Sequence, residues 1–541
     1  MNNPNVVAVL IDVVSIQAYV FGSNKLKENI GASYHVEDVY RSHLEEAVRK
    51  AINTEDIDFN AWRSPLGKIK IKEEGVLFEV GYIGGGNALL LFREEYHAKE
   101  FIKEWTRTLL VETPGLTTAI ALDTFNVDNS KAGIKSLFDL LKRNKSSHVP
   151  QTVIPRHGIT SECPRTGYSM DIWNDIEEDK KEYISSVSYS KIKVVEEQNG
   201  KRENATKKLE DKLLNKEQKE EYCFINDLGK LGQAGNEKNY IAIVHIDGND
   251  IGKKFQDAEF LSDRRELSRV VTEATDNSFK EFLTNIIKDY TKILKALGID
   301  SKVYKEDGRR IIPVRPIILG GDDITFVCDG RMGIYFAKIF MEKFGECTLN
   351  GEKLTACAGV AITKTKYPFS RGYLLAEQLC KCAKEFRKGK NINGRRLGVG
   401  NQDKGSWIDF HISSGGFSET ISEIRDSYYC NHEQGNLIAR PYMINSEDKS
   451  GFDLLVKKTK RLKNTLARTK IKDLRNIMTM GQEETRKFLN LLSAKDVKED
   501  VKDYGSFLKG IFENKETPYF DMIELMEFYP SFELEKKRDE S

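Results

Sequence analysis

The sequence has no uninterrupted apolar run of about 18 residues, the length that a membrane-spanning helix requires. Its first residues, MNNPNVVAVLIDVV, also lack the basic region and the long apolar core of a secretory signal peptide. A large net charge is missing as well, because 84 basic and 83 acidic residues leave only +1. We therefore expect a cytoplasmic protein without a membrane partner, in which any nucleic acid binds to a local patch of charge.

The eight cysteines include no C-x-x-C pair, which argues against a disulfide framework and against a four-cysteine zinc site. Most of them lie in apolar runs, so we expect buried and reduced thiols. Cys380 and Cys382 form a C-x-C, but they lie in a predicted helix, where side chains two positions apart point in different directions. Cys163, in ECPRTGY, has no cysteine nearby and is predicted to lie in a loop.

The length of 541 residues, with 39% apolar side chains and 40 glycines, is typical of a globular chain with roughly three or four domains. The stretch from Asn174 to Tyr222 is dominated by Lys, Glu, Asp and Asn and has little apolar periodicity. It is interpreted as a linker or an exposed helical hairpin whose charges face solvent. From about Ala439 onward the apolar spacing is helical.

Two parts of the chain carry the same pattern. The apolar strand VVAVLID ends at Asp12, and the apolar strand YIAIVHID ends at Asp247. A glycine-rich turn follows each strand: 74 positions separate Asp12 from Gly86, and 75 separate Asp247 from Asp322. A further apolar strand, TTAIALDTF or TACAGVAIT, follows each turn. The matched spacing predicts a duplicated module in which helices pack on one face of an antiparallel sheet, as in ferredoxin-like α+β folds.

The second glycine-rich turn, Gly-Gly-Asp-Asp, carries the residues with the clearest chemistry. It lies between two apolar runs and should form a tight hairpin turn that presents Asp322 and Asp323. Aspartate and glycine are common in turns, so this turn alone is equally compatible with a structural role. If the strand ending at Asp247 lies beside the hairpin, three carboxylates converge and need a compensating cation. Mg²⁺ or Mn²⁺ with substrate phosphates meets that need, and the chemistry implied is nucleotidyl transfer.

Two neighbouring segments could hold phosphates. After Asp247 the chain forms a polar turn that opens toward a helix, and backbone N–H groups in such a turn can cradle a triphosphate. The residues of this turn are Gly248, Asn249, Asp250, Ile251 and Gly252. Residues 381–396 hold seven basic groups and one acid, with Lys384 and Lys388 beside an apolar helical stripe. A solvated basic face is the alternative for this segment; a phosphate-facing lysine there, preferably Lys384, would complete the site.

The motifs HIDGNDIGKKF, LGGDDITFVCDG and ACAGVAITKTKYPF, followed by AEQLCKCAK, resemble the cyclase palm domain of the large polymerase-like subunit of type III CRISPR effector complexes. That palm is related to GGDEF diguanylate cyclases. The segments IDVVSIQAYVFGSNKLKENIGASYHV and YIGGGNALLLF resemble the first palm of the same subunits. The fold implied is α+β, with two ferredoxin-like palm domains that have antiparallel sheets and an α-helical C-terminal domain.

The resemblance implies domain boundaries and site residues. The domains are a first palm with a degenerate GGGN turn at 1–150, an inter-palm linker or helical segment at 151–235, a second palm with the GGDD cyclase site at 236–435, and an α-helical C-terminal domain at 436–541. The catalytic residues implied are Asp247, Asp322 and Asp323, and the metal ligands are these three with Gly248. The nucleotide-binding residues are Gly248–Gly252, Gly320, Gly321, Lys384, Lys388, Gly84, Gly85, Gly86 and Asn87.

The first half departs from the second at its turn, where Gly86 and Asn87 stand in place of the two acids although Asp12 remains. It is therefore expected to bind the acceptor nucleotide or to serve as scaffold. No HD nuclease domain precedes the first palm, and no cysteine cluster lies between the palms, so cleavage of target DNA is not expected.

The leading hypothesis is a metal-dependent nucleotidyltransferase that condenses ATP into a cyclic oligoadenylate-type second messenger in CRISPR-like antiviral defence. Its partners would be ATP or other nucleoside triphosphates, and RNA and other effector-complex subunits are possible. The alternative is a non-catalytic scaffold subunit that binds nucleotide or RNA through the basic segment 381–396. Template-directed polymerisation is a third hypothesis, for which the sequence offers no thumb or fingers signature.

Overall fold

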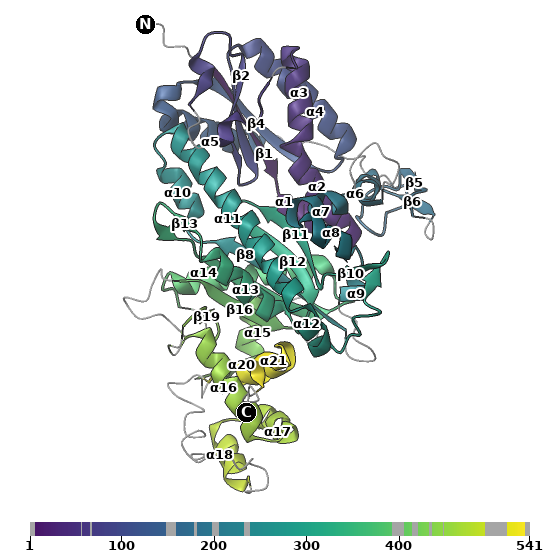
Figure 1. The fold of residues 1–541 in the computed structure, drawn as a ribbon, viewed down its shortest axis with the longest axis vertical. Coiled ribbons are helices and arrows are strands. Elements are labelled where there is room, and N and C mark those ends of the chain that lie inside the picture. The colour runs from purple at the N-terminus through teal and green to yellow at the C-terminus, as the bar shows by residue number, and fades with distance from the viewer. Residues whose placement is uncertain are drawn as a thin grey trace. The chain divides into compact units, whose positions relative to one another are not determined.

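The computed structural model describes residues 6–55, 57–64, 68–147, 158–177, 181–196, 205–231, 239–391, 405–413, 420–431, 435–446, 448, 450–492 and 517–535. These residues form a mixed α+β fold with several sheets, as the sequence predicts (Figure 1). Within these ranges, every helix is too short or too polar to serve as a membrane span.

Two compact units make up the fold, and neither is a single stretch of chain. Unit 1 consists of Met1–Lys219, Asp250–Asn277 and Ile317–Ile324. Unit 2 consists of Glu220–Asn249, Ser278–Pro316 and Thr325–Ser541. The boundary between the two units therefore does not coincide with the boundary between the two repeated modules of the sequence.

An antiparallel sheet forms the centre of unit 1. Its strand order in the described residues is β2-β3-β1-β4, and β1 pairs with both β3 and β4. The strands are β1 (Val6–Val14), β2 (Phe78–Gly84), β3 (Asn87–Phe92) and β4 (Thr117–Phe125). Strand β1 is buried almost throughout, which explains why its sequence is apolar rather than alternating. The register places Asp12 opposite Asn87.

Helices pack on this sheet through aromatic and aliphatic side chains. Phe92 of β3 contacts Phe101 of α4, which stacks on Trp105 one turn later. Helix α5 follows β4 and packs against it. The helices of this region are α1 (Ile16–Phe21), α2 (Leu26–Val39), α3 (Ser42–Ile52), η1 (Ala61–Arg63), η2 (Lys70–Lys72), α4 (Glu95–Glu112), η3 (Val127–Asn129) and α5 (Ser130–Ser147).

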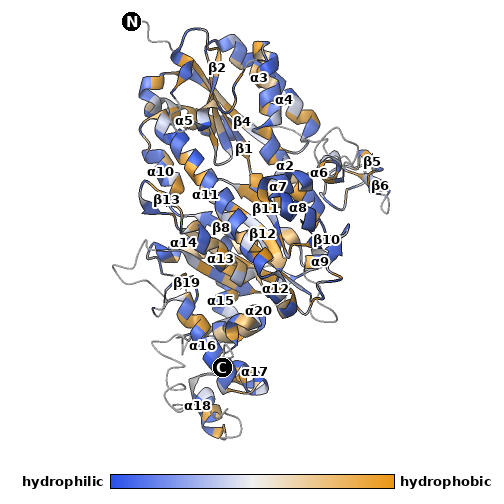
Figure 2. Cartoon of the chain, viewed as in Figure 1, coloured by the Kyte–Doolittle hydropathy of each residue, from blue (hydrophilic) through white to orange (hydrophobic). Residues whose placement is uncertain are grey.

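The charged stretch between the two halves of the sequence is more buried than predicted. It forms the short strands β5 (Ile172–Asn174) and β6 (Glu182–Ile184) and the helices α6 (Ser186–Glu196), α7 (Ala205–Leu213) and α8 (Lys216–Glu221). Figure 2 shows α7 and α8 in blue, in keeping with their charged sequences. A Cβ added to Gly31 of α2 would nevertheless lie 1.9 Å from the Lys191 carbonyl oxygen, so α6 packs directly on α2.

Two lysines correct the interpretation of this stretch as a solvated face. Lys191 is 3% exposed; its ammonium donates to the Tyr19 carbonyl at 2.7 Å and lies 4.1 Å from the Tyr19 ring centre. Lys208 is also buried and pairs with Asp38 at 3.3 Å. Long lysine side chains bury their methylenes, and ion pairs and aromatic rings compensate their charge, so a charged composition does not require an exposed segment.

A second sheet has the strand order β11-β12-β8-β15-β16-β19 in the described residues. Strand β15 runs antiparallel to β8 and parallel to β16, and β19 joins β16 as an antiparallel neighbour. The strands are β8 (Tyr240–Gly248), β11 (Val314–Gly320), β12 (Asp323–Asp329), β15 (Ala356–Lys364), β16 (Trp407–Ile412) and β19 (Tyr442–Met443). When the four strands of each set are numbered by their order in the sequence, β2-β3-β1-β4 and β11-β12-β8-β15 both have the order second, third, first, fourth across the sheet. The repeated sequence pattern predicts this agreement.

An aromatic cluster fills the core of unit 2 beneath its helices. Phe279 and Phe282 of α11 contact Phe326 of β12 and Phe340 of α13, with ring centres 5.2–6.2 Å apart. Two helices, α11 and α12, span most of the chain between residues 261 and 297. The helices are α9 (Leu228–Leu231), α10 (Ile251–Asp257), α11 (Leu261–Lys288), α12 (Tyr290–Leu297), α13 (Gly333–Phe344), α14 (Phe369–Arg387) and α15 (Ile421–Tyr428). The short strands are β7 (Tyr222–Cys223), β9 (Lys305–Glu306), β10 (Arg309–Ile311), β13 (Thr348–Leu349), β14 (Glu352–Lys353), β17 (Cys430–Asn431) and β18 (Gly435–Asn436).

The described residues after Ala439 are mainly helical. They form α16 (Phe452–Thr465), α17 (Arg468–Met478), α18 (Gln482–Leu491), α20 (Tyr519–Phe528) and α21 (Ser531–Leu534). Arg440 ties this part to the sheet of unit 2. It is 1% exposed and contacts Asp521 and Glu524 of α20 and the Phe410 carbonyl of β16.

Gly359 allows α14 to lie close to β15. A Cβ at this position would lie 1.9 Å from the Ala376 carbonyl oxygen and 2.4 Å from the Cys380 nitrogen. We expect Gly359→Ala to lower the free energy of unfolding by about 1–3 kcal/mol, because backbone atoms cannot yield as a flexible side chain can. Denaturant unfolding measures this, with Gly158→Ala as control because none of the described residues lies within 4 Å of its Cβ position. Equal midpoints for both variants would contradict the close packing.

Candidate functional site

Asp247 and Lys384 form an ion pair in unit 2. Asp247 lies next to the end of β8, and Lys384 lies in the last turn of α14. The lysine Nζ is 2.5 Å from Asp247 Oδ2 and donates a hydrogen bond to the Gly248 carbonyl oxygen at 3.1 Å. Burial acts to lower the pKa of Lys384, but the attraction and the hydrogen bond of Asp247 outweigh it and raise the pKa above its ordinary value. The lysine is therefore held as a cation beside this carboxylate.

The packing of α14 explains why Lys384 reaches this point. Cys380, Ala383 and Phe386 form a buried stripe of the helix against Cys357 and Trp407. The Cys380 thiol also donates to the Cys357 carbonyl at 3.2 Å. With this stripe turned to the sheet, Lys384 emerges at the edge of the packed face with a quarter of its side chain exposed. The cysteines of the C-x-C are buried at Cys380 and half-buried at Cys382, as their helical spacing predicts.

Asn249 fixes the turn that follows β8. Its backbone N–H donates to the Thr355 carbonyl at 2.8 Å, and its Nδ2 donates to Thr355 Oγ1 at 3.0 Å. The Cys357 thiol donates to Asn249 Oδ1 at 3.3 Å. Asn249 is 6% exposed, so its side chain positions the turn between β8 and α10. Asp250 then adopts a positive φ of 61° before α10 begins at Ile251, which confirms a turn opening toward a helix.

His245, two residues before Asp247, has a structural role. The ring is 4% exposed, its Nδ1 lies 3.2 Å from Thr325 Oγ1, and it contacts Tyr373 edge-on. Burial lowers its pKa to about 4, with Asp247 acting in the opposite direction. His245 is therefore neutral near pH 7 and adds no cation beside Asp247.

Helix α11 holds two glycine-rich turns together within unit 1. Thr275 Oγ1 donates to the Gly321 carbonyl at 2.6 Å, in the turn between β11 and β12. Ser268 Oγ, two turns earlier on the same helix, donates to the Ile83 carbonyl at 2.6 Å, beside the turn between β2 and β3. A Cβ added to Gly321, where φ is +60°, would lie 3.8 Å from the Gly85 nitrogen. The GGDD turn and the GGGN turn of the sequence thus lie against each other.

Asp322 and Asp323 complete the GGDD turn. Gly320 ends β11, Asp323 begins β12, and both carboxylate residues are partly buried. The predicted hairpin turn is therefore present.

The first half of the chain has an ion pair that matches the one in the second half. Asp12, near the end of β1, pairs with Lys145 on α5, the helix after β4. Lys384 is likewise on the helix that follows the last strand of its set. Burial raises the pKa of Asp12, and Lys145 opposes this change. Asn87 lies opposite Asp12 in the register, and its Oδ1 is buried without a hydrogen-bond partner among the described residues.

Tyr40 joins the GGGN turn to strand β1 through hydrogen bonds. Its hydroxyl donates to the Gly86 carbonyl and accepts from the Val13 N–H at 3.0 Å. The Asn87 amide donates to the Gly85 carbonyl at 3.2 Å. Burial raises the pKa of Tyr40, so the hydroxyl keeps its proton for the first of these bonds.

Asp247 lies in unit 2, whereas Asp322 and Asp323 lie in unit 1, so the convergence of the three carboxylates stays a prediction. Among the described residues, no three His, Cys, Asp or Glu side chains come together as a ligand set for a metal ion. Within unit 2, Asp247 takes a compensating charge from Lys384.

The basic segment is brought to this site only in part. Lys384 contacts Asp247, whereas Lys388 is exposed at the C-cap of α14, and residues 392–396 lie outside the described ranges. Glu377, three residues before Cys380 on α14, has a pKa raised by burial and by Asp247. Neither Glu377 nor Lys145 lies in a recognisable sequence motif, so only the tertiary structure identifies them as neighbours of Asp247 and Asp12.

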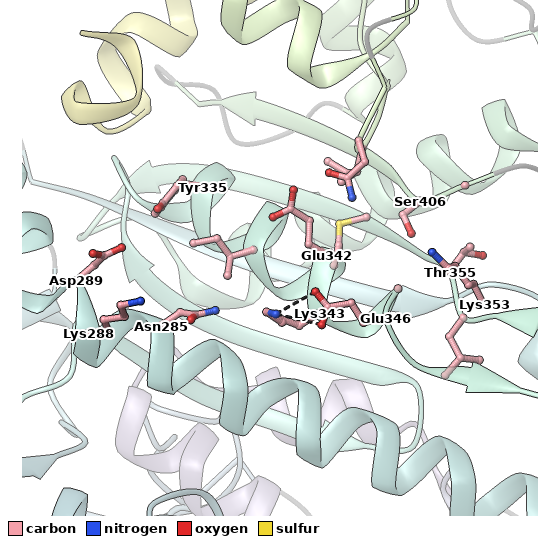
Figure 3. Close-up of a pocket in the computed structure, with 17 residues that line it drawn as sticks. Asn285, Lys288, Asp289, Tyr335, Glu342, Lys343, Glu346, Lys353, Thr355 and Ser406 are labelled. Carbon is pink, nitrogen blue, oxygen red and sulfur yellow. Dashed lines mark hydrogen bonds and ion pairs between the residues drawn. The ribbon is translucent and has the colours of Figure 1, made fainter. Parts of the chain in front are cut away.

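A polar pocket of about 620 Å³ lies elsewhere in unit 2, beside α13 (Figure 3). Lysines and acids line it together, and Lys343 and Glu346 form an ion pair at 2.9 Å within it. Thr355, which holds Asn249, also lines this pocket. The mixed charges give it no preference for an anion or a cation.

The strand ending at Asp247, the GGDD hairpin and the helix carrying Lys384 belong to one sequence segment. Residues 240–393 match the family model described as Cas10/Cmr2, second palm domain. The resemblance drawn from the sequence is confirmed for this palm. No curated protein sequence matches the chain.

Solved structures extend the likeness of fold beyond the palm. The crystal structure of the Csm1–Csm4 cassette in complex with pppApApA matches with a TM-score of 0.52 and 13% identity, covering 97% of this chain and 70% of the matched chain. The cassette structures with cA4 and with cA3 each match with a TM-score of 0.50, 12% identity and 97% coverage of this chain, and cover 70% and 69% of the matched chains. At this identity the likeness shows a shared fold and nothing more.

Proposed function

We propose that the protein is a metal-dependent nucleotidyltransferase that condenses ATP into a cyclic oligoadenylate-type second messenger in CRISPR-like antiviral defence. The observation that carries the proposal is the Asp247–Lys384 pair at 2.5 Å, at the end of a strand in the Cas10/Cmr2-like palm whose hairpin bears GGDD. A carboxylate and a cation side by side suit a metal–triphosphate complex, which presents both signs of charge. The match of residues 240–393 to the Cas10/Cmr2 second palm domain also supports nucleotidyl transfer as the chemistry of this site.

The proposal treats the chain as two ferredoxin-like palms followed by an α-helical C-terminal domain. It is supported by the shared arrangement of β2-β3-β1-β4 and β11-β12-β8-β15, and by a helix after the last strand of each set. The domain boundaries at residues 150, 235 and 435 remain predictions.

Mg²⁺ or Mn²⁺ is the proposed cofactor, and the donor atoms suit it. The carboxylates of Asp247, Asp322 and Asp323 and the Gly248 carbonyl are hard oxygen donors of the kind these ions prefer. Mg²⁺ is usually held by one or two carboxylates together with substrate phosphates, so a preformed cage of three protein ligands is not required. When bound, the ion would stabilise charge on the attacking and leaving oxygens of a phosphoryl transfer.

The protein's own residues would bind and orient the nucleotides. Lys384 would neutralise the triphosphate, and the backbone between Gly248 and Gly252 would approach the phosphates closely. The GGGN turn, which lies against Gly321 in unit 1, would hold the acceptor nucleotide, with Lys145 as the matching cation. The first half lacks the two acids of the second, so we assign the chemical step to the second half.

ATP is the proposed substrate, and other effector-complex subunits are the proposed partners in the cytoplasm. The matched Csm1–Csm4 structures contain pppApApA, cA4 and cA3, which are adenylate oligomers. Incubation of the protein with labelled nucleoside triphosphates and Mg²⁺ or Mn²⁺, with and without RNA, tests the proposal. We expect a labelled oligoadenylate, and the absence of any product under all these conditions would contradict it.

Lys384→Met is expected to raise the KM for ATP by about 10–100-fold, because a hydrogen bond to a charged group contributes about 1.5–3 kcal/mol. Steady-state kinetics against ATP concentration measures this. Lys381→Met is the matched control, since Lys381 is exposed on the same helix. If both variants have the wild-type KM, Lys384 does not bind the triphosphate.

A further inference from the structure

The described residues 158–177 and 181–196, within unit 1, form a small module that begins with a tight loop. In Cys163-Pro164-Arg165-Thr166-Gly167, the Gly167 N–H donates to the Cys163 carbonyl at 2.8 Å, with Gly167 at a φ of +76°. The Cys163 N–H donates to the Tyr168 carbonyl at 2.8 Å, and Glu162 forms an isolated bridge with Ser169. The chain thus turns back on itself at Cys163 and brings the side chain of Thr166 to the same side.

A hairpin and a helix follow this loop. Strands β5 and β6 pair in the antiparallel sense, and α6 begins directly after β6 (Figure 1). Ser185 precedes α6, and Ser188 lies in its first turn. The loop therefore contributes one pair of residues, Cys163 and Thr166, and the start of α6 contributes another, Ser185 and Ser188. Two residues separate the members of each pair.

Hydrogen bonds join Cys163, Thr166 and Ser185 through their side chains, and Ser188 joins this buried cluster through its backbone N–H. Thr166 Oγ1 and Ser185 Oγ are 2.8 Å apart, and the Ser188 N–H donates to Ser185 Oγ at 3.3 Å. Cys163 and Ser188 are fully buried, and Ser185 is 1% exposed. Burial raises the pKa of the Cys163 thiol, but hydrogen bonds with the backbone of Ser185 and Arg165 and with the Thr166 and Ser185 side chains together lower it below its ordinary value. All these groups converge on the sulfur.

The spacing of the four residues is that of a structural zinc site. Eighteen residues separate the pair 163/166 from the pair 185/188, within the range of the pattern C-x₂-C-x₁₅₋₂₀-C-x₂-C. Such sites bind Zn²⁺ through four cysteine or histidine ligands. Here only Cys163 is of that type, and the other three positions carry hydroxyl groups, which are poor zinc ligands.

We propose that residues 158–196 are a finger-like module in which hydrogen bonds among Cys163, Thr166, Ser185 and Ser188 take the place of a Zn²⁺ ion. Ser188 Oγ also donates to Glu28 Oε2 of α2 at 2.9 Å, and Arg165 pairs with Glu28 at 3.4 Å. These contacts fasten the module to the rest of unit 1. The module keeps the residue spacing of such a metal site without its ligands.

Conversion of the three hydroxyl residues to thiols tests this proposal. Thr166→Cys/Ser185→Cys/Ser188→Cys in the full chain is expected to bind one Co²⁺ with the absorption of a tetrahedral thiolate site, and Zn²⁺ is expected to displace it. Zn²⁺ should raise the unfolding temperature of this variant, and a chelator should lower it again. The unmodified protein should copurify without stoichiometric zinc and unfold at the same temperature with or without chelator.

The matched control moves one thiol by two residues along α6. Thr166→Cys/Ser185→Cys/Ser190→Cys has the same number of cysteines but should bind Co²⁺ at least tenfold more weakly. If the triple variant folds only when Zn²⁺ is present, the proposal is supported, because the metal then supplies the lost hydrogen bonds. No tetrahedral Co²⁺ site in a folded variant, failure to fold with and without Zn²⁺, or a loss of stability of the unmodified protein on chelation would each overturn the proposal.

Discussion

Replacement of Asp322 and Asp323 by alanine together is expected to reduce oligoadenylate synthesis from ATP at least about 100-fold, with the fold retained. The two carboxylates are the oxygen donors of the GGDD turn, and groups that stabilise transition-state charge each contribute about 100–1,000-fold. The turn joins β11 and β12, which pair through their backbones, so we expect the variant to fold. Initial rates with saturating ATP and Mg²⁺ measure the effect.

The control for this variant is another pair of adjacent acids. Glu483 and Glu484 are both exposed in the first turn of α18, and Glu483→Ala/Glu484→Ala should keep wild-type activity. Circular dichroism and unfolding temperature verify that both variants are folded. An active, folded Asp322→Ala/Asp323→Ala variant would remove the GGDD turn from the mechanism and favour the scaffold hypothesis.

Arg440→Met is expected to lower the free energy of unfolding by about 3–5 kcal/mol, because it removes the buried cation that pairs with both Asp521 and Glu524. Arg440 Nε donates to Asp521 Oδ1 at 2.8 Å, and its other nitrogens contact Glu524 and the Phe410 carbonyl. The guanidinium also lies 4.3 Å from the Phe410 ring centre. Burial raises the pKa of Asp521 while Arg440 opposes this change, so the aspartate depends on the arginine for its charge.

Denaturant unfolding of the full chain measures the loss. Arg468→Met is the matched control, because Arg468 is exposed at the start of α17 and its loss should change stability by less than about 0.5 kcal/mol. The double variant Arg440→Met/Asp521→Asn should regain part of the loss, since it removes one of the stranded charges. Equal stability of the Arg440 and Arg468 variants would show that the buried cluster does not hold α20 to the sheet.

The repeated spacing of the sequence is sufficient to predict the strand pattern of both halves. Each set contains a buried apolar strand that ends near an aspartate, Asp12 or Asp247, followed by a hairpin with a glycine-rich turn. Such signals are local: turn residues and runs of apolar residues can be recognised in the amino-acid sequence without knowledge of tertiary contacts. Lys384 could also be predicted, because it stands beside a helical apolar stripe.

Other parts of the site depend on contacts that are distant in the sequence. Lys145 pairs with Asp12 from a helix more than a hundred positions later, and no motif surrounds it. Lys191 and Lys208 are buried because α6 and α7 pack on α2, although their composition suggested an exposed segment. The cluster at Cys163 contains no C-x-x-C pair, because three of its four positions carry hydroxyl groups. In each case the chemistry is visible only when tertiary packing brings the partners together.

We propose that this chain joins ATP molecules at the GGDD half. Mass spectrometry of the products formed from ATP and Mg²⁺, with and without RNA, tests this activity, with Asp322→Ala/Asp323→Ala measured in parallel. We expect linear or cyclic adenylate oligomers from the unmodified protein and only unreacted ATP from the variant. Unreacted ATP from both, under every condition, or the same oligomers from both, would contradict it.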